Sequence, residues 1–224
     1  MNILVIEDIH NDIENLSNYA DKIAMLDFDV IVCPGDFTDI PPRGFTPIDI
    51  TKIILEEFKT FGKPILAVPG NLDGSIIDFL SKERVSIHGA GRIIDGVGFY
   101  GFGGAKTPFS TSFEPTEEEI EEGLKKGFEE VKNAELKVQV THSPPLGTKL
   151  DVVYTGAHVG SSAVRNFIEK NKPIAAICAH IHEAKGTDEI NGTKVINAGR
   201  FPEGYCGLIS IKNKQASVNV VNLI

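Results

Sequence analysis

The stretch Asn2-Ile-Leu-Val-Ile-Glu-Asp8-Ile-His10 opens the chain and sets the pattern that decides its fold. Its apolar residues predict a short buried strand over residues 2–7, because a brief apolar run that ends in polar residues is typical of a covered strand. The strand leads directly into two side chains that can bind a metal, Asp8 and His10. Residues 12–25 then have the spacing of an amphipathic helix, with a capping residue at position 11 or 12.

The same arrangement recurs along the chain. Four more apolar runs predict strands over residues 29–33, 64–68, 136–140 and 174–178, and they lead into Asp36, Asn71, His142, and the pair His180 and His182. In α/β sheets, ligands gather beyond the carboxyl ends of the strands. Parallel strands would therefore bring these side chains, together with Asp8 and His10, to one edge of the fold.

The strand ends supply two aspartates, one asparagine and four histidines. This mixture of oxygen and nitrogen donors suits divalent Mn, Fe, Zn, Co or Ni better than a calcium site made only of oxygens. Seven ligands are too many for one tetrahedral ion and about right for two ions that share a carboxylate. The sequence therefore predicts a site for two metal ions.

Each of these side chains alone also has a structural explanation. Asp8 could cap the helix that follows it, and Asp36 and Asn71 could stabilise turns. His142 could form a hydrogen bond within a rigid turn, and the last two histidines could be outward positions of a strand. The metal hypothesis rests on the placement of all seven at strand ends.

The rest of the chain predicts a mixed α/β fold. Short β segments with glycines fill residues 85–102, and Thr116 with Glu119 forms a capping box at the start of a helix. A helix is expected over 161–170, and Asn191-Gly192 predicts a hairpin turn. The remaining strands are expected over 185–190, 193–196, 206–211 and 216–221. We expect two packed mixed sheets in a single domain that spans residues 1–224.

The amino-acid composition limits the kinds of molecule that the protein is expected to bind. The formal charge of −9 argues against broad binding of nucleic acid, and an anionic substrate would need a local positive centre such as a metal. No apolar run reaches the roughly 18 residues of a membrane helix. The N-terminus lacks the features of a signal peptide, and the three cysteines have no CxxC spacing. We therefore expect a cytoplasmic protein with buried free thiols, no membrane partner, and an oligomeric state that the sequence leaves open.

This constellation resembles the calcineurin-like metallophosphoesterase family, and in particular its small single-domain prokaryotic branch. The motif order of that family is D-x-H, G-D-x-x-D, G-N-H-[DE], a later histidine and G-H-x-H. The corresponding segments here are Asp8-Ile-His10, Gly35-Asp-Phe-Thr-Asp39, Gly70-Asn-Leu-Asp73, His142 and Ala179-His-Ile-His182. The resemblance covers nearly the whole chain and implies a four-layer αββα sandwich of two mixed β-sheets flanked by helices.

The resemblance also implies how the ligands are shared. One ion would be held by Asp8, His10, Asp36 and His182, and the other by Asn71, His142 and His180, with Asp36 bridging the two. Ala179 replaces a glycine of the family pattern, which is a small backbone change. Asp39 and Asp73 either orient the ligands or only stabilise turns.

A second departure from the family pattern affects the chemistry. Leu72 replaces the histidine of G-N-H-D, which in the family stabilises the transition state or protonates the leaving oxygen. Loss of a general acid costs about 10²–10⁴-fold in rate. We hypothesise that His158, in the glycine-rich loop Thr155-Gly-Ala-His-Val-Gly, is a catalytic residue that supplies the missing imidazole. The alternative is an ordinary loop histidine.

The expected function is a dinuclear-metal-dependent phosphoesterase that hydrolyses phosphate esters, in particular small phosphodiesters. Two divalent ions (Mn, Fe, Ni or Zn) lower the pKa of bound water, so that hydroxide can attack phosphorus. The alternative is a protein-binding scaffold of the same fold with little or no catalysis. Leu72 favours the scaffold, whereas retention of all seven ligand positions favours the enzyme. A repair nuclease is disfavoured by the acidic composition.

Overall fold

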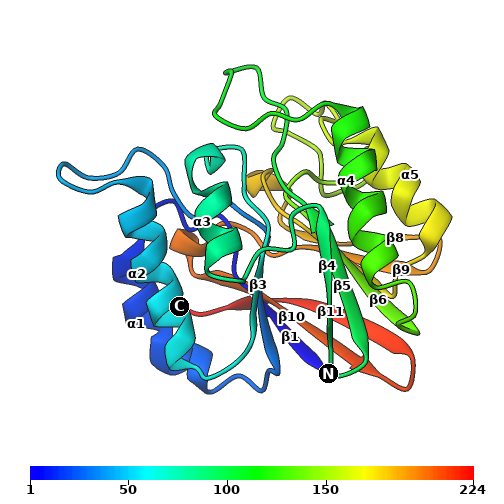
Figure 1. Cartoon of the computed structure of the whole chain (residues 1–224), viewed down its shortest axis with the longest axis horizontal. Coiled ribbons are helices and arrows are strands. Elements are labelled where there is room, and N and C mark those ends of the chain that lie inside the picture. Colours follow the sequence, from blue (N-terminus) through cyan, green and yellow to red (C-terminus); the bar gives the residue numbers. More distant parts are fainter.

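The computed structural model describes residues 1–224 and has four layers, with two sheets in the middle and helices outside (Figure 1). One outer layer contains α1 (Ile13–Ala24), α2 (Pro47–Thr60) and α3 (Ile77–Lys82), and the other contains α4 (Glu117–Glu130) and α5 (Ser162–Asn171). The four-layer αββα sandwich predicted from the sequence is confirmed. None of the helices combines the length and apolar character that crossing a membrane requires.

The first sheet contains the N-terminal strands and the C-terminal hairpin. Its order is β11-β10-β1-β2-β3, with the bounds β1 Asn2–Val5, β2 Val30–Cys33, β3 Ile65–Ala67, β10 Tyr205–Lys212 and β11 Gln215–Asn222. β1, β2 and β3 run parallel, whereas β10 pairs antiparallel with β1. The three parallel strands therefore end at the same edge of the sheet.

The second sheet is also mixed. Its order is β4-β5-β6-β7-β9-β8, with the bounds β4 Ala90–Ile94, β5 Val97–Phe102, β6 Leu136–Thr141, β7 Ala175–Cys178, β8 Gly186–Ile190 and β9 Thr193–Asn197. The four central strands are parallel and the two edge strands antiparallel. The β8–β9 turn has positive φ at both Asn191 (49°) and Gly192 (91°), which is the geometry that an Asn-Gly hairpin turn favours.

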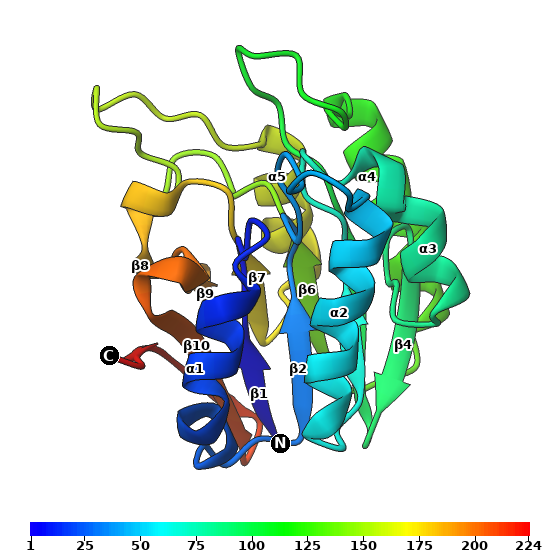
Figure 2. The same cartoon turned by 90° about the vertical axis from the view of Figure 1, so that its left-hand side faces the viewer.

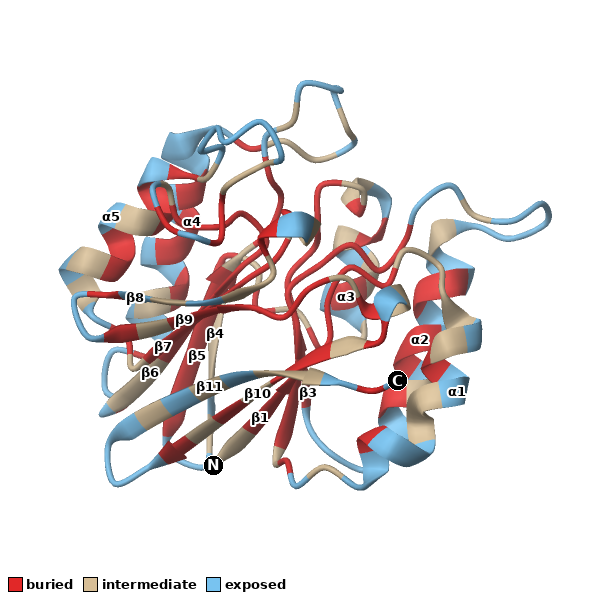
Figure 3. Cartoon of the chain, turned by 180° about the vertical axis from the view of Figure 1, so that it is seen from behind, coloured by how far each residue is buried: buried red, intermediate tan, exposed pale blue.

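Strand β1 shows why these strands are apolar on both faces. Leu4 belongs to the apolar layer under α1 and α2, whereas Ile3 and Val5 belong to the layer between the sheets. A third apolar layer lies under α4 and α5 and includes Leu124 and Phe167. Figure 3 shows the buried residues along the strands of both sheets. All three cysteines are buried free thiols, as expected.

Side-chain caps fix the starts of four helices, α1, α2, α4 and α5. Glu119 N donates to Thr116 Oγ1 (3.2 Å) and Thr116 N donates to Glu119 Oε2 (2.8 Å), so the predicted capping box of α4 is present. At α1 the cap is Asp12, whose carboxylate accepts from Asn15 N at 2.9 Å. The alternative explanation of Asp8 as a helix cap is therefore wrong, because Asp12 fills that role.

A partly buried histidine outside the predicted site, His88, gives a test of stability against pH. His88 Nδ1 accepts from Gly103 N (3.0 Å), its ring lies 4.2 Å from that of Phe102, and burial lowers its pKa to about 4. Below its ordinary pKa near 6.5 the unfolded chain takes up a proton at His88 that the folded chain does not. This group therefore destabilises the fold progressively as the pH falls from 6.5 to 4.

We expect the unfolding free energy of the protein to fall by about 1–2 kcal/mol more between pH 7 and pH 5 than that of His88→Asn. The variant keeps an oxygen acceptor near the position of Nδ1 but does not titrate. Urea unfolding followed by circular dichroism at both pH values measures the difference. Equal losses of unfolding free energy in the parent protein and the variant would contradict a lowered pKa of His88 in the folded state.

Candidate metal centre

The carboxyl ends of five parallel strands meet where the two sheets face each other, at the top of Figure 2. The candidate ligands follow these strands, with Asp8 and His10 after β1, Asp36 after β2, Asn71 after β3, His142 after β6, and His180 and His182 after β7. The structure brings all seven predicted side chains to this edge, in two groups. Both sheets contribute, so the site forms only when they pack together.

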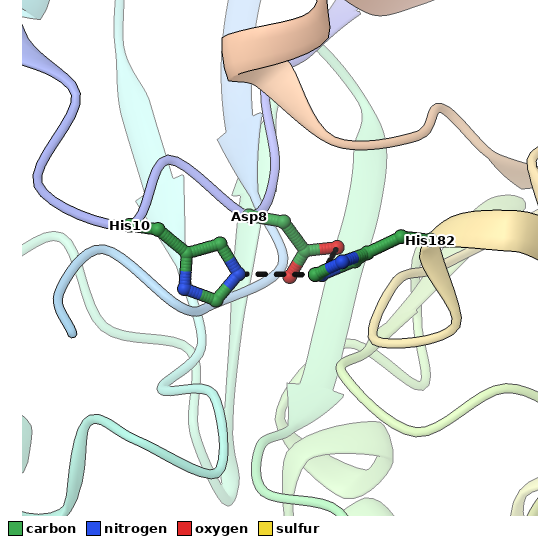
Figure 4. Close-up of side chains that lie close together, drawn as sticks. All are labelled: Asp8, His10 and His182. Carbon is green, nitrogen blue, oxygen red and sulfur yellow. Dashed lines mark hydrogen bonds and ion pairs between the residues drawn. The ribbon is translucent and has the colours of Figure 1, made fainter.

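The first group consists of Asp8, His10 and His182, whose ligand atoms all lie within 4.8 Å of one another. His10 Nε2 lies 3.2 Å from His182 Nε2, and His182 Nε2 lies 3.5 Å from Asp8 Oδ2 (Figure 4). Three donor atoms thus face a common point from three side chains. Asp8 is fully buried, whereas the two histidines are partly open to the surface.

The second group consists of Asp36, His142 and His180, with Asn71 beside them. His142 Nε2 lies 3.0 Å from Asn71 Oδ1 and 3.5 Å from Asp36 Oδ2. Asp36 Oδ2 also lies 3.9 Å from His10 Nε2 of the first group. The Asp36 carboxylate therefore faces both groups, as a bridging ligand must.

The backbone around these residues is strained. Asp8, His10, Asp36 and His180 all have positive φ, between 49° and 75°, a region that non-glycine residues rarely adopt. Hydrogen bonds between the loops hold them there, from Asp8 N to Gly35 O (3.2 Å) and from His10 N to Asp36 O (3.0 Å). Such strain persists only where the surroundings fix it, and it is concentrated at functional sites.

Glycine is required at two positions beside Asp36. A Cβ on Gly35 would lie 2.5 Å from Gly70 N, and a Cβ on Gly70 would lie 1.9 Å from Asp36 Oδ1. Neither distance leaves room for a side chain. The glycines of the G-D and G-N motifs thus allow the loops after β2 and β3 to touch, which places Asp36 against Asn71.

Asp73 holds the same two loops together. It is fully buried and accepts hydrogen bonds from Phe37 N (3.1 Å), Thr38 N (3.2 Å) and Gly70 N (2.9 Å). Burial and the nearby Asp36 charge raise its pKa to about 6. Asp39, in contrast, is exposed and accepts from Ile40 N (2.7 Å) in a turn. Of the two aspartates left open by the sequence, Asp73 supports the ligand loops and Asp39 stabilises a turn.

Burial and neighbouring charges act in opposite directions on the pKa values of several site residues. Burial and the charge of Asp36 raise the pKa of Asp8 to about 7, although His142 opposes this. At Asp36, burial is outweighed by the charge and hydrogen bond of His142, which lower its pKa to about 2. Burial also lowers the pKa of His180 to about 3 and that of His182 to about 4. Most of the imidazoles are therefore kept neutral, which is the form that binds a metal.

His142 is the exception and is oriented by the backbone. Burial opposes its protonation, but Asp36 outweighs burial and raises its pKa to about 9. Its Nδ1 lies 2.9 Å from the carbonyl oxygen of Pro34, to which Nδ1–H donates. Such a bond fixes the ring and directs Nε2 at Asn71 and Asp36, the arrangement common for metal-binding histidines.

Two divalent cations fit this donor set. Asp8 Oδ1 is buried without a hydrogen-bond partner, and such orphaned atoms are rare in folded proteins. Carboxylate oxygens and imidazole lone pairs that converge within a few ångströms repel one another unless a cation or proton lies between them. The oxygen and nitrogen donors are those of Mn, Fe, Ni and Zn sites. The identity of the metals is not fixed by the donors.

A cavity of about 690 Å³ lies over the two groups. Its floor includes His10, Asp36 and Asn71. Its walls come from two loops, one over residues 106–111 and one over residues 153–159. Leu72 also lines the cavity, and its backbone N donates to Asp36 Oδ1 at 3.0 Å.

The structure does not place His158 among the residues that line this cavity. Its Nδ1 lies 2.7 Å from Asp151 Oδ1, and 47% of its side chain is exposed. Asp151 is buried and also accepts from Gly147 N and Gly160 N. The next residue, Val159, does line the cavity, so His158 lies on a wall loop. Its catalytic role stays a prediction.

Sequence reasoning missed the cavity walls. Phe109, Val153 and Val159 follow no spacing rule, and nothing in the sequence separates Lys106, which also lines the cavity, from an ordinary surface lysine. The usable signal was the length of the two irregular segments, because loops of more than about 12 residues in a folded domain are often functional. The sequence gives no signal for Arg200 either, yet its Nε is buried, and its charge helps to lower the pKa of His182.

The sequence comparison agrees with the geometry. The model of the calcineurin-like phosphoesterase family matches residues 1–184, so the chain belongs to this family. It is 35% identical over 211 residues to the uncharacterised protein MJ1162 of Methanocaldococcus jannaschii, a match that covers 92% of this chain and 90% of the relative. The family match includes all seven candidate ligands.

Solved structures share the fold. The protein TT1561 of Thermus thermophilus superimposes with a TM-score of 0.70 at 18% identity, covering 100% of this chain and 99% of the other. A structure described as a novel archaeal phosphodiesterase has a TM-score of 0.53 at 16% identity, covering 99% and 100%. At these identities the likeness shows the architecture alone.

Metal content tests the candidate ligands directly. We expect about two divalent ions per chain after dialysis against Mn²⁺ and removal of the excess, and fewer than one in Asp36→Asn, because Asp36 faces both groups. Asp39→Asn is the matched control, since Asp39 is exposed and contributes no donor atom to either group, and it should keep both ions. Elemental analysis counts the metal. Full loading of Asp36→Asn would contradict the bridging role.

Proposed function

We propose that the protein is a phosphoesterase that uses two divalent metal ions to hydrolyse small phosphodiesters. The observation that carries the proposal is the Asp36 carboxylate, buried beneath an open cavity and facing both groups of candidate ligands. Membership of the calcineurin-like phosphoesterase family supports the reaction class. The archaeal phosphodiesterase of similar fold is consistent with a diester substrate.

The candidate ligands divide by position. Asp8, His10, Asp36 and His182 would hold one ion, and Asn71, His142, His180 and the shared Asp36 would hold the other. When bound, such ions lower the pKa of water toward neutrality and offset the charge of the phosphate oxygens. The protein residues supply the fixed geometry: the Pro34 carbonyl orients His142, and the Asp73 carboxylate keeps the loops after β2 and β3 in contact.

The hydrolysis balances with water alone. A water oxygen forms a bond to phosphorus, the bond from phosphorus to the ester oxygen breaks, and the departing oxygen takes up a proton. Leu72 offers no proton at the cavity. We assign the proton to His158, because Val153 and Val159 of the same loop wall the cavity and Asp151 holds Nδ1 of the ring. With Nδ1–H donated to Asp151, Nε2 carries a proton only in the imidazolium form, and that proton is the one His158 would transfer to the departing oxygen.

A screen of nitrophenyl phosphate esters tests the reaction class. We expect turnover of bis(nitrophenyl) phosphate with Mn²⁺, Fe²⁺, Ni²⁺ or Zn²⁺, its loss on chelation, and a loss of about 10³-fold or more in Asp36→Asn. Release of nitrophenolate is followed by absorbance. Asp39→Asn should match the parent protein.

The second candidate function is a scaffold of the same fold that binds other proteins. The observation in its favour is Leu72, a side chain without acid–base chemistry at the cavity. If the protein binds two metal ions per chain but turns over no phosphate mono- or diester, the result would contradict the enzyme hypothesis and support the scaffold.

The role of His158 has its own test. We expect His158→Ala to lower kcat by about 10²-fold for diesters with poor leaving groups and by much less for nitrophenyl esters, which need no protonation. Metal content should stay at the parent value, because His158 does not contact the seven candidate ligands. Unchanged kcat for the poor leaving groups would remove His158 from the mechanism. The exposed Tyr154→Ala on the same loop controls for a general effect on the loop.

A further inference from the structure

The cavity over the candidate metal ligands has an apolar wall. Beyond those ligands its apolar lining consists of Leu72, Pro108, Phe109, Val153, Val159 and Ile181. Its polar lining is only Lys106 and three threonines. The volume of about 690 Å³ lies in the range of pockets that hold small organic ligands, so there is room for more than a phosphate group.

Part of this wall is open to water. Phe109 is 79% exposed and Val159 is 42% exposed, so the chain leaves much of their apolar surface uncovered. Covering such surface is favourable by about 25 cal/mol per Å². Their position beside the candidate phosphate site indicates what covers them, because any ester bound there must place its organic group in the same cavity.

The wall that carries Phe109 is held in place before any ligand binds. Glu114 Oε1 accepts from Thr107 Oγ1 (2.6 Å) and from Thr111 N (2.5 Å), and Phe109 N donates to Thr107 Oγ1 (3.1 Å). These hydrogen bonds lower the pKa of Glu114 to about 2, so the carboxylate stays charged at neutral pH.

The same loop is tied to the floor of the cavity. Phe113 N and Ser112 Oγ both donate to the carbonyl oxygen of Asn71, at 2.9 and 3.1 Å. Asn71 is one of the seven candidate ligands. The distance from the apolar wall to the phosphate position is therefore fixed by hydrogen bonds, and a preorganised pocket loses little entropy on binding.

The charge of the cavity lining limits the number of phosphate groups that a bound substrate can carry. Lys106 is the one lysine or arginine that lines the cavity, and the protein carries a net charge of −9. Beyond the proposed metal ions, one positive side chain is left to face a ligand, which suits a single phosphate group at the metals better than a polyphosphate chain that extends past them. A sugar or polyol would find only Lys106 and the three threonine hydroxyls as partners in the walls. Its other hydroxyls would face apolar side chains, and each unpaired polar group costs about 1–3 kcal/mol.

We propose that the substrate is a phosphodiester whose second ester group is apolar, an alkyl or aryl group that packs against Phe109 and Val159 while the phosphate lies over the seven candidate ligands. This inference rests on the proposed phosphodiesterase function. Beyond that function, the inference specifies the chemical class of the second ester group, which the two wall loops would select.

A matched set of substrates tests the selection. All are nitrophenyl phosphodiesters with the same leaving group, and the second group is methyl, hexyl, or a hydroxyethoxyethyl chain of the same length as hexyl. We expect kcat/KM for the hexyl ester to exceed that for the equally long polar ester by about tenfold or more, since each buried methylene contributes about 0.8 kcal/mol. Equal or reversed values would overturn the inference.

Substitutions of the two exposed wall residues test whether the apolar wall causes the preference for the hexyl ester. Phe109→Ser and Val159→Ser should each reduce the hexyl preference by about threefold to tenfold, because each removes apolar contact. Both residues are exposed, so these variants should fold. Met25→Ala is the control: Met25 is 86% exposed and follows α1, away from the cavity, so the preference should be unchanged. An undiminished preference in both wall variants would contradict the role of the wall.

A binding measurement separates this inference from the proposed function. By isothermal titration calorimetry of the metal-loaded protein, hexylphosphonate should bind about tenfold more tightly than methylphosphonate, and Phe109→Ser should reduce that ratio. Turnover of all esters at similar rates, with equal phosphonate affinities, would overturn the apolar selection and leave the phosphodiesterase standing. No turnover of any ester, together with tight binding of hexylphosphonate, would remove the phosphodiesterase but support the apolar pocket.

Discussion

The burial of one carboxylate, that of Asp36, is the constraint on which the site depends. Asp36 is 3% exposed at the junction of the two sheets, where an unpaired charge costs several kcal/mol. The chain compensates with the N–H of Leu72 on one oxygen and the His142 ring beside the other. Gly70 leaves room for the carboxylate, because any side chain there would collide with it. The proposed cations would complete this compensation, so that metal binding and the packing of the two sheets stabilise each other.

The strained loops show how the fold keeps the carboxylate in position. Asp8, His10 and Asp36 have backbone conformations that are unfavourable for their residue types, and neighbouring loops hold them there through main-chain hydrogen bonds. Asp73 adds a buried carboxylate that accepts from both the β2 and β3 loops. A site fixed in this way needs little reorganisation when a ligand arrives, which is the structural basis of electrostatic preorganisation.

Two long loops form the walls of the cavity over the candidate ligands. The strand ends carry the candidate ligands, whereas the walls over them are formed by the segments around Phe109 and Val159. Leu72 belongs to the same apolar environment, so the residue that departs from the family pattern also contributes to the wall. Chemistry located at strand ends and selectivity located in loops is a common division in α/β proteins.

The sequence by itself determined the local features: the strands, the α4 capping box, the Asn191-Gly192 hairpin and the seven candidate ligands. Each depends on residues close together in the chain, where periodicity and side-chain chemistry act directly. Only the tertiary structure decided that Asp12 rather than Asp8 caps α1, that Asp73 rather than Asp39 joins the ligand loops, and that His158 lies beside Asp151 outside the cavity lining. The Asp73 partner Phe37 N lies 36 positions away. Contacts between such distant loops arise from the packing of whole sheets, which no local pattern encodes.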